Sequence, residues 1–98
     1  MSSYCILLNF TDQGMRTIRD GAKRIDAARD LAGGLGIEFT DLRLCLGGYD
    51  VMIQMEAPND EAVAKFVLAA GARGNVRSTT LKTFSEKEYR KLLTELPA

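Results

Sequence analysis

The chain has 98 residues, the size of one domain, and we expect residues 1–98 to form a single unit. Lys and Arg together number 13, as do Asp and Glu, so the net charge is zero. Proteins that bind nucleic acids need a cationic face, and this balance therefore predicts no nucleic-acid partner. The sequence has no histidine, which is the commonest metal ligand and the usual proton shuttle near neutral pH. We expect neither a metal site nor a cofactor.

Cys5 and Cys45 lie inside apolar runs, where cysteine usually behaves as a small core hydrophobe. The sequence shows no signal peptide and no apolar segment of membrane length. These features predict a cytoplasmic protein with reduced thiols and no membrane partner. A chain of this length supports one core but not also a deep enclosed cavity. A binding pocket is then expected between elements, in a surface groove or at an interface with a second copy.

The first predicted elements are a strand and a long helix. Residues 4–10 form a dense run of β-favouring types, and Thr11 or Asp12 follows as a helix cap. Apolar residues then recur at spacings of three and four, which predicts one helix over residues 13–35. The apolar stripe of this helix consists of Met15, Ile18, Ala22, Ile25, Ala28, Ala32 and Leu35. A glycine-rich segment ends the helix.

The next two strands flank a pair of glycines. Apolar residues in the segment 37–46 alternate first on odd and then on even positions, which predicts a β-bulge near residues 40–41. Gly47 and Gly48 permit backbone angles that other residues resist, so the chain can reverse within two residues. A third strand is expected over residues 49–56.

The last third of the chain predicts a helix, a strand and a shorter helix. Asn59 or Asp60 caps the first of these helices. Its buried stripe consists of Val63, Phe66, Val67 and Ala70. Residues 75–84 form the fourth strand, and Ser85 and Glu88 make a capping box for the terminal helix. That terminal helix carries its apolar residues on one side: Tyr89, Leu92, Leu93 and Leu96.

This order, β-α-β-β-α-β with an extra C-terminal helix, predicts an α+β sandwich of the ferredoxin-like type. In that arrangement both helices cover one face of a four-stranded antiparallel sheet. The other face is left bare, and we call it the open face. A bare face with apolar side chains must be covered, most simply by a second copy of the chain. We therefore predict a homodimer or a larger homo-oligomer.

Strand alternation indicates which side chains lie on the open face. Helix-covered faces are uniformly apolar, so the odd positions of the third strand, Tyr49 included, are expected to meet the helices. Asp50, Met52 and Gln54 then lie on the open face. The other strands add Leu7, Asn9, Arg43, Cys45, Arg77, Thr79 and Leu81. Such a mixture of apolar and hydrogen-bonding groups is typical of a ligand groove or a wet dimer interface.

The candidate ligand-binding residues are Asn9, Arg43, Tyr49, Asp50, Gln54 and Arg77. Each has a structural explanation as well. Asp50 follows a glycine turn, so it could instead accept backbone N–H bonds or pair with Arg43. Tyr49 could be a core aromatic whose hydroxyl reaches a partner or solvent. The strand amides of Asn9 and Gln54 are either pocket groups or hydrogen-bond partners between subunits.

Several short motifs in a fixed order resemble the GYD family, which takes its name from the tripeptide seen here as Gly48-Tyr49-Asp50. The other motifs are Thr11-Asp12-Gln13-Gly14 after the first strand, Glu56-Ala57-Pro58-Asn59-Asp60-Glu61, Gly74-Asn75-Val76 and Thr79-Thr80-Leu81. The resemblance spans nearly the whole chain to Phe84. It implies a ferredoxin-like domain of the dimeric α/β-barrel type, in which two sheets pair through their open faces. It implies no catalytic residues, because the function of the family is essentially unassigned.

Three functions are compatible with these features. The first is a homo-oligomeric binding module that holds a small organic ligand on the open face or at the subunit interface. It is favoured because no nucleophile–base pair can be recognised. The second is a cofactor-independent oxygenase or isomerase, with Asp50 as base and Tyr49 or Arg43 stabilising a developing oxyanion. The third is a purely structural interaction subunit, whose open face would be filled by its partner's side chains.

Overall fold

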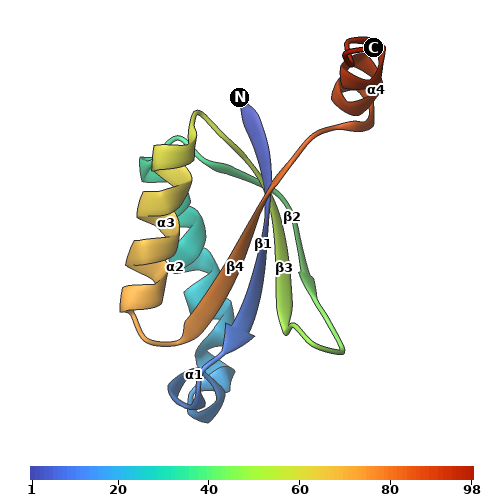
Figure 1. The fold of residues 1–98 in the computed structure, drawn as a ribbon. Helices are drawn as coiled ribbons and strands as arrows, with labels where there is room; N and C mark the ends of the chain where they lie inside the picture. The colour runs from blue at the N-terminus through green and yellow to red at the C-terminus, as the bar shows by residue number, and fades with distance from the viewer.

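A computed structural model describes residues 1–98 and confirms the predicted order of elements (Figure 1). The elements are β1 (Ser2–Phe10), α1 (Asp12–Arg16), the 3-10 helix η1 (Ile18–Asp20), α2 (Gly21–Gly34), β2 (Glu38–Leu44), β3 (Val51–Ala57), α3 (Asp60–Ala72), β4 (Val76–Thr83) and α4 (Glu86–Thr94). Two predicted caps are present at helix starts. The Thr11 side chain accepts from the Gly14 N–H, and the Asn59 side chain accepts from the Ala62 N–H.

The four strands form one antiparallel sheet in the order β2-β3-β1-β4. β1 is a central strand, paired with β3 on one side and with β4 on the other. Figure 1 shows α2 and α3 side by side on one face of this sheet, while the opposite face carries no helix. The predicted ferredoxin-like α+β fold is confirmed.

The predicted bulge lies in β2, where the pairing with β3 shifts between Phe39 and Asp41. The shift places Phe39 opposite Met55 and Leu42 opposite Ile53. One extra residue resets the alternation of β2, so apolar residues on both sides of the bulge face the helices. The change of phase in the sequence is therefore the direct signature of this bulge.

The single helix predicted over residues 13–35 is wrong, because the chain breaks at Thr17. Thr17 has φ −112° and ψ 28°, outside the helical region, and separates α1 from η1. The segment before the break is held by the turn that precedes β4, through a bond from Thr11 N to Asn75 O of 3.0 Å. This contact redirects the chain, so the expected stripe does not form at its N-terminal end. The residues left exposed there are Met15 and Ile18.

The connection between β2 and β3 spans residues 45–50, wider than the predicted two-residue turn. Gly47 has φ +143°, which favours glycine. Leu46, expected to continue the apolar run of β2, is 97% exposed. A bond from Cys45 N to Asp50 O of 2.8 Å closes the connection. β2 therefore ends at Leu44, before this loop, and β3 begins at Val51, after it.

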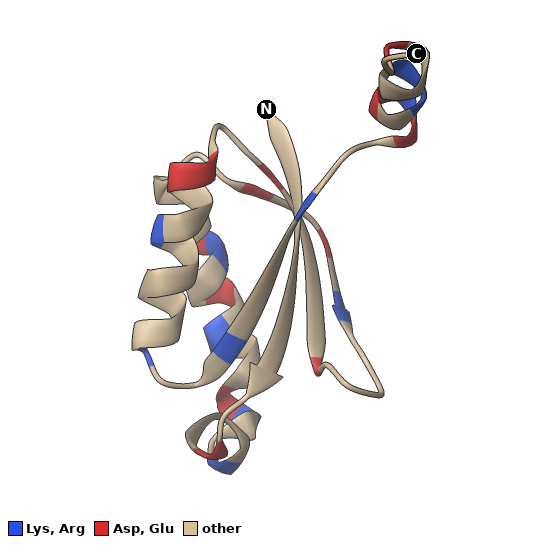
Figure 2. Cartoon of the chain, viewed as in Figure 1, with Lys and Arg blue, Asp and Glu red and all other residues tan.

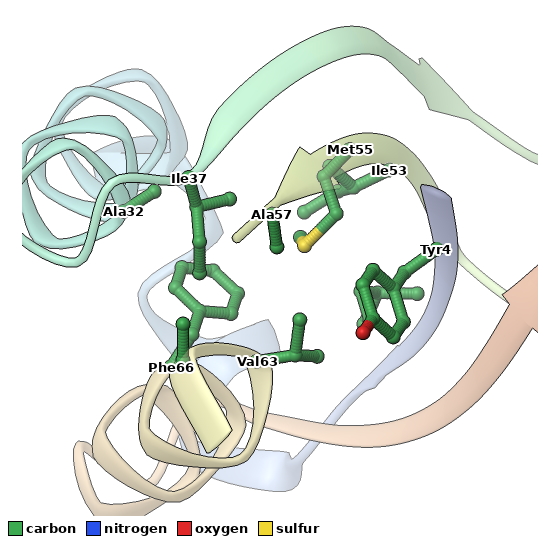
Figure 3. Close-up of a cluster of buried hydrophobic side chains, with 10 residues drawn as sticks. Tyr4, Ala32, Ile37, Ile53, Met55, Ala57, Val63 and Phe66 are labelled. Carbon is green, nitrogen blue, oxygen red and sulfur yellow. The ribbon is translucent and has the colours of Figure 1, made fainter. Parts of the chain in front are cut away.

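The hydrophobic core lies between the sheet and the helices (Figure 3). Its ten buried residues are Tyr4, Ile6, Ala32, Ile37, Ile53, Met55, Ala57, Ala62, Val63 and Phe66. Phe66 meets Phe39 edge-on, with ring centroids 5.6 Å apart and planes at 89°. These residues come from the first half of β1, from β3, from the last part of α2 and from the first half of α3, with Ile37 just before β2. The dense packing is therefore concentrated at one end of the sandwich.

Helix α4 stands apart from the sheet and from the other helices (Figure 1). Its predicted capping box is present, with Glu88 N donating to Ser85 Oγ (3.1 Å) and Ser85 N donating to Glu88 Oε1 (2.9 Å). The radius of gyration is 15.0 Å. A compact chain of this length should have about 13 Å. Helix α4 is thus locally well formed but lacks a packing partner in its own chain.

Candidate functional site

The strand registers bring the predicted open-face residues together. Leu7 lies opposite Met52 on β3, and Cys5 lies opposite Leu81 on β4. These four apolar side chains are neighbours in the middle of the open face, and we call them the apolar centre. On the same face, the polar candidates around this centre are Asn9, Arg43, Gln54 and Arg77. The predicted alternation is confirmed for the residues within the strands, whereas Cys45 and Asp50, also expected on the open face, lie in the loop between β2 and β3.

The loop before β3 is fastened to the end of β1. Asp50 Oδ2 accepts from Phe10 N at 2.9 Å, and Asp50 N donates to Leu8 O at 2.8 Å. Asn9 Nδ2 donates to Gly48 O at 3.0 Å. These bonds satisfy backbone groups where the pairing of β1 with β3 stops. Of the explanations open for Asp50, the structure shows the bond from a backbone N–H. Asn9 instead bonds a backbone carbonyl of its own chain, which neither of its expected roles included.

The arginine and amide candidates differ in how they are engaged. Arg43 pairs with Asp41 on its own strand, Nε to Oδ2 at 2.8 Å, and not with Asp50. The hydrogen bond from Arg43 lowers the pKa of the Asp41 carboxyl. Gln54 and Arg77 are exposed, and Arg77 forms no ion pair. These two side chains are the ones that remain free for a ligand or for a second copy.

Tyr49 does not point into the helix-covered core. Its side chain is 39% exposed, and it is absent from the buried cluster. The expectation assumed that the strand begins at Tyr49, but β3 begins at Val51. Strand alternation cannot place a residue that belongs to the preceding loop.

The main cavity lies on the helix side of the sheet, between α2, α3 and the sheet, with a volume of about 470 Å³. Its apolar walls include Leu8, Phe10, Leu42, Val51, Ile25 and Phe66. Three cations, Lys23, Arg24 and Arg73, also line it. The sequence left several places open for a pocket, and this one lies between elements. None of the six candidate ligand-binding residues lines it.

A second group of polar residues, missed from the sequence, joins the start of α3 to the sheet. The Tyr4 hydroxyl donates to the Asp60 carboxylate, and Lys82 Nζ donates to Asp60 Oδ1 at 3.1 Å. The bond from Tyr4, and then that from Lys82, lower the pKa of the Asp60 carboxyl, while the bond to Asp60 raises the pKa of Tyr4. The three side chains are far apart in the sequence, so no local pattern reveals them. They fasten α3 to β1 and β4.

The bonds that Asp60 accepts from Tyr4 and Lys82 are expected to make the stability of the fold depend on pH in the acidic range. Because the folded pKa of Asp60 lies below its ordinary value, its contribution is complete above the ordinary aspartate pKa of about 4 and is lost as pH falls through the folded value. The Tm values of the wild type and of Asp60→Asn should therefore differ at neutral pH and converge in acid. Thermal unfolding followed by circular dichroism measures this. A difference that is constant down to about pH 2.5 contradicts the role given to the carboxylate, and Glu61→Gln is the matched control.

Three further features of the chain concern metals, thiols and membranes. No group of three or more histidine, cysteine, aspartate or glutamate side chains is arranged to hold a metal ion. Cys5 and Cys45 are both free, and burial raises the pKa of the Cys5 thiol. No helix combines the length and the hydropathy needed to cross a bilayer.

Known proteins share this fold and part of this sequence. The glutamine synthetase and cystathionine beta-lyase binding protein of Thermus thermophilus is 29% identical over 83 residues, which are 84% of this chain and 87% of that protein. The crystal structure of MtbAldR matches with a TM-score of 0.66 and 20% identity, over 87% of this chain and 54% of that one. The present chain thus spans about half of MtbAldR, and this likeness shows a shared fold. The GYD domain matches residues 4–93, from β1 into α4. The chain therefore belongs to the GYD domain family.

Proposed function

We propose that the protein is a non-catalytic binding module that works as a homo-oligomer, assembled through the open face and α4. The observation that carries this proposal is the apolar stripe of α4, which lies uncovered on a helix detached from the body (Figure 1). The stripe consists of Tyr89, Leu92 and Leu93, between 45% and 58% exposed. Leu96, expected on the same helix, lies just beyond its end at Thr94 and is 64% exposed. A helix with such a stripe is stable in water chiefly when the stripe packs against another surface.

The open face supplies a matching surface. The apolar centre groups Cys5, Leu7, Met52 and Leu81 on one side of the sheet, with no helix over them. Contiguous apolar patches rimmed by polar groups mark interaction sites in soluble proteins. A second copy would cover this centre with its own open face and would offer a partner to α4. Self-association therefore accounts for both uncovered surfaces at once.

The second part of the proposal concerns what the assembled module binds. The relative from Thermus thermophilus is named for binding two enzymes, glutamine synthetase and cystathionine beta-lyase. We extend a protein-docking role of this kind to the present chain. A small organic ligand between paired open faces is the second candidate. It is favoured by the free side chains of Gln54 and Arg77, which lie on that face around the apolar centre.

The enzymatic alternative has less support from the geometry. Asp50, its expected base, uses Oδ2 to accept the Phe10 N–H, so this carboxylate already has a structural role. Arg43, an expected oxyanion stabiliser, is paired with Asp41 instead. Tyr49 has no hydrogen bond that would orient or activate its hydroxyl beside them. No hydrogen bond or ion pair joins these three residues to one another.

The assembly is tested by substitutions at the two proposed contact surfaces. Leu92→Lys on α4 and Leu81→Lys on the open face each put a charge where an apolar contact is expected. Each should weaken self-association about tenfold or more, because central apolar contacts dominate interfaces. Sedimentation equilibrium of the wild type, expected to be a dimer or larger, and of both variants measures this. A wild type that is monomeric at micromolar concentration overturns the proposal.

Leu68→Lys is the matched control, because Leu68 is 72% exposed on α3, outside both proposed contact surfaces. It should leave the association constant unchanged. The wild type and the three variants are then titrated by calorimetry against glutamine synthetase and cystathionine beta-lyase from the organism that produces this chain. Absence of binding by an oligomeric wild type overturns the protein-docking part alone. Binding that survives in monomeric variants would show that docking does not require assembly.

A further inference from the structure

We infer that the cavity between the sheet and helices α2 and α3 is a binding site for an amphipathic anion, namely a small carboxylic acid with an apolar tail. This inference does not depend on the proposed assembly, because the cavity lies on the opposite side of the sheet from the open face. Its volume of about 470 Å³ falls within the range of about 300–1,000 Å³ typical of small-molecule sites. The walls are formed by the second half of β1, the start of β3 and the facing parts of both helices.

The cavity exists because the helices carry small residues where they pass over these strands. On the helix side, Gly21, Ala27 and Ala28 of α2 and Ala70 of α3 line it. On the sheet side, larger residues such as Leu8 and the first residues of β3 face the gap without filling it. The opposite end of the same sandwich is filled by Phe66, Val63 and Met55 (Figure 3). The wall is therefore apolar but unfilled, and an apolar tail would gain free energy by leaving water for it.

The charge at this cavity has one sign. Lys23, Arg24 and Arg73 line it, and no aspartate or glutamate does. None of the three forms an ion pair within the chain. Figure 2 shows both cationic and acidic segments along α2, and a cationic segment at the C-terminal end of α3. A carboxylate head group at the rim would therefore meet three cations, and none of the residues that line the cavity is an acid.

Arg24 is also held in place. Its Nη1 donates to Thr17 Oγ1 at 2.7 Å, and its Nη2 donates to Gly14 O at 3.1 Å. Both acceptors are neutral, so the charge of the guanidinium is not cancelled by its partners. A fixed cation loses little conformational entropy when a ligand binds, which favours binding. The break of the helix at Thr17 thus contributes to the site, because it turns this hydroxyl toward Arg24.

A second occupant to be distinguished is α4 of another copy. A helix of nine residues occupies roughly 1,000 Å³ if its diameter is about 10 Å, which is about twice the volume of the cavity. The cavity could take only part of its stripe. The unopposed positive charge also favours an anion over this helix, whose ends carry both signs.

The experiment is a titration of the full chain, followed by ¹H–¹⁵N NMR, with decanoate, decanol and decyltrimethylammonium. All three share a ten-carbon chain and differ in head-group charge. Decanoate should give saturable shifts at amides of the N-terminal half of α2 and at Leu8 and Val51. It should bind about three- to five-fold tighter than decanol, and the cationic probe should bind weakest. Equal affinity for decanoate and the cationic probe, or no saturable shifts at all, overturns the inference.

Two pairs of variants separate this site from the others. Ala28→Leu fills the cavity and should abolish the saturable shifts, whereas Ala22→Leu, on an exposed position of the same helix, should not. Arg73→Gln should weaken decanoate about three- to five-fold and leave decanol unchanged. Arg77→Gln, which lies on the open face, should change neither. Decanoate shifts centred on Met52 and Leu81 instead, or intermolecular contacts from α4 methyls to Val51 in the ligand-free protein, also overturn the inference.

Discussion

Replacing Phe66 by alanine is expected to lower the free energy of unfolding by about 3–5 kcal/mol. Phe66 is 2% exposed, and it packs edge-on against Phe39 with ring centroids 5.6 Å apart. It also forms part of the wall of the cavity, so it separates the packed end of the sandwich from the hollow end. Removing the ring would join the two, and little nearby structure could collapse into the gap. The cost should therefore lie at the high end of large-to-small substitutions.

Urea denaturation followed by circular dichroism measures this change. Leu68→Ala is the matched control, since Leu68 lies on the same helix at 72% exposure and should change stability by no more than about 0.5 kcal/mol. Total stabilities of domains are about 5–15 kcal/mol, so Phe66→Ala should leave the chain only marginally folded. If it costs less than about 1 kcal/mol, the ring does not hold the wall described here.

The order of elements could be predicted because the signals that define it are local. Period-two and period-3.6 hydrophobic patterns identified every strand and both sheet-covering helices. The caps at Thr11, Asn59 and Ser85 involve residues three positions apart, so they are legible in the sequence. Even the bulge of β2 is local, because it changes the phase of alternation within one strand. Fold and open face followed from these patterns alone.

The two predictions about the fold that are wrong have a common cause. In both, contacts between segments distant in the sequence decide the local structure. The first helix is divided at Thr17 because the chain before it docks on Asn75, some sixty residues later. Nothing in the local apolar pattern reveals this contact. The loop between β2 and β3 is likewise wider than predicted because Asp50 binds the end of β1 through Leu8 and Phe10. The glycine pair signals a turn, but distant backbone groups decide its width.

The candidate site was predicted in part. Alternation placed Asn9, Arg43, Gln54 and Arg77 on the open face, and the registers agree. Alternation could not show that the Asn9 side chain donates a hydrogen bond to the backbone carbonyl of Gly48. The helix-side cavity lies in one of the places left open for a pocket, but its lining residues were not predicted, although the sequence holds a signal for them. The apolar stripes of both helices contain alanine and glycine where the helices cross the second half of β1. The apolar pattern correctly predicts that these positions are buried. Their side chains are, however, too small to fill the space between helix and sheet.

Replacing Gly14 by alanine is expected to lower the free energy of unfolding by about 3 kcal/mol. Alanine normally stabilises a helix position relative to glycine by about 1 kcal/mol, so the sign itself is informative. An added Cβ would lie 2.1 Å from Asn75 O, a backbone atom that cannot move aside alone. Helix α1 would have to shift and lose the bonds that hold it, including Thr11 Oγ1 to Gly74 O at 2.5 Å. Chemical denaturation of the two proteins measures the change.

Gly33→Ala is the matched control, because an added Cβ at Gly33 of α2 meets no heavy atom within 4 Å. It should stabilise the chain by roughly 0.5–1 kcal/mol. If Gly14→Ala and Gly33→Ala changed the free energy of unfolding in the same direction, the close approach of α1 to Asn75 would be disproved. Because Gly14 O also accepts from Arg24 Nη2, a shift of α1 should loosen the fixed cation at the cavity. Any Gly14→Ala protein that remains folded should therefore bind decanoate more weakly than Gly33→Ala does, which links the docking of α1 to the charge of the proposed site.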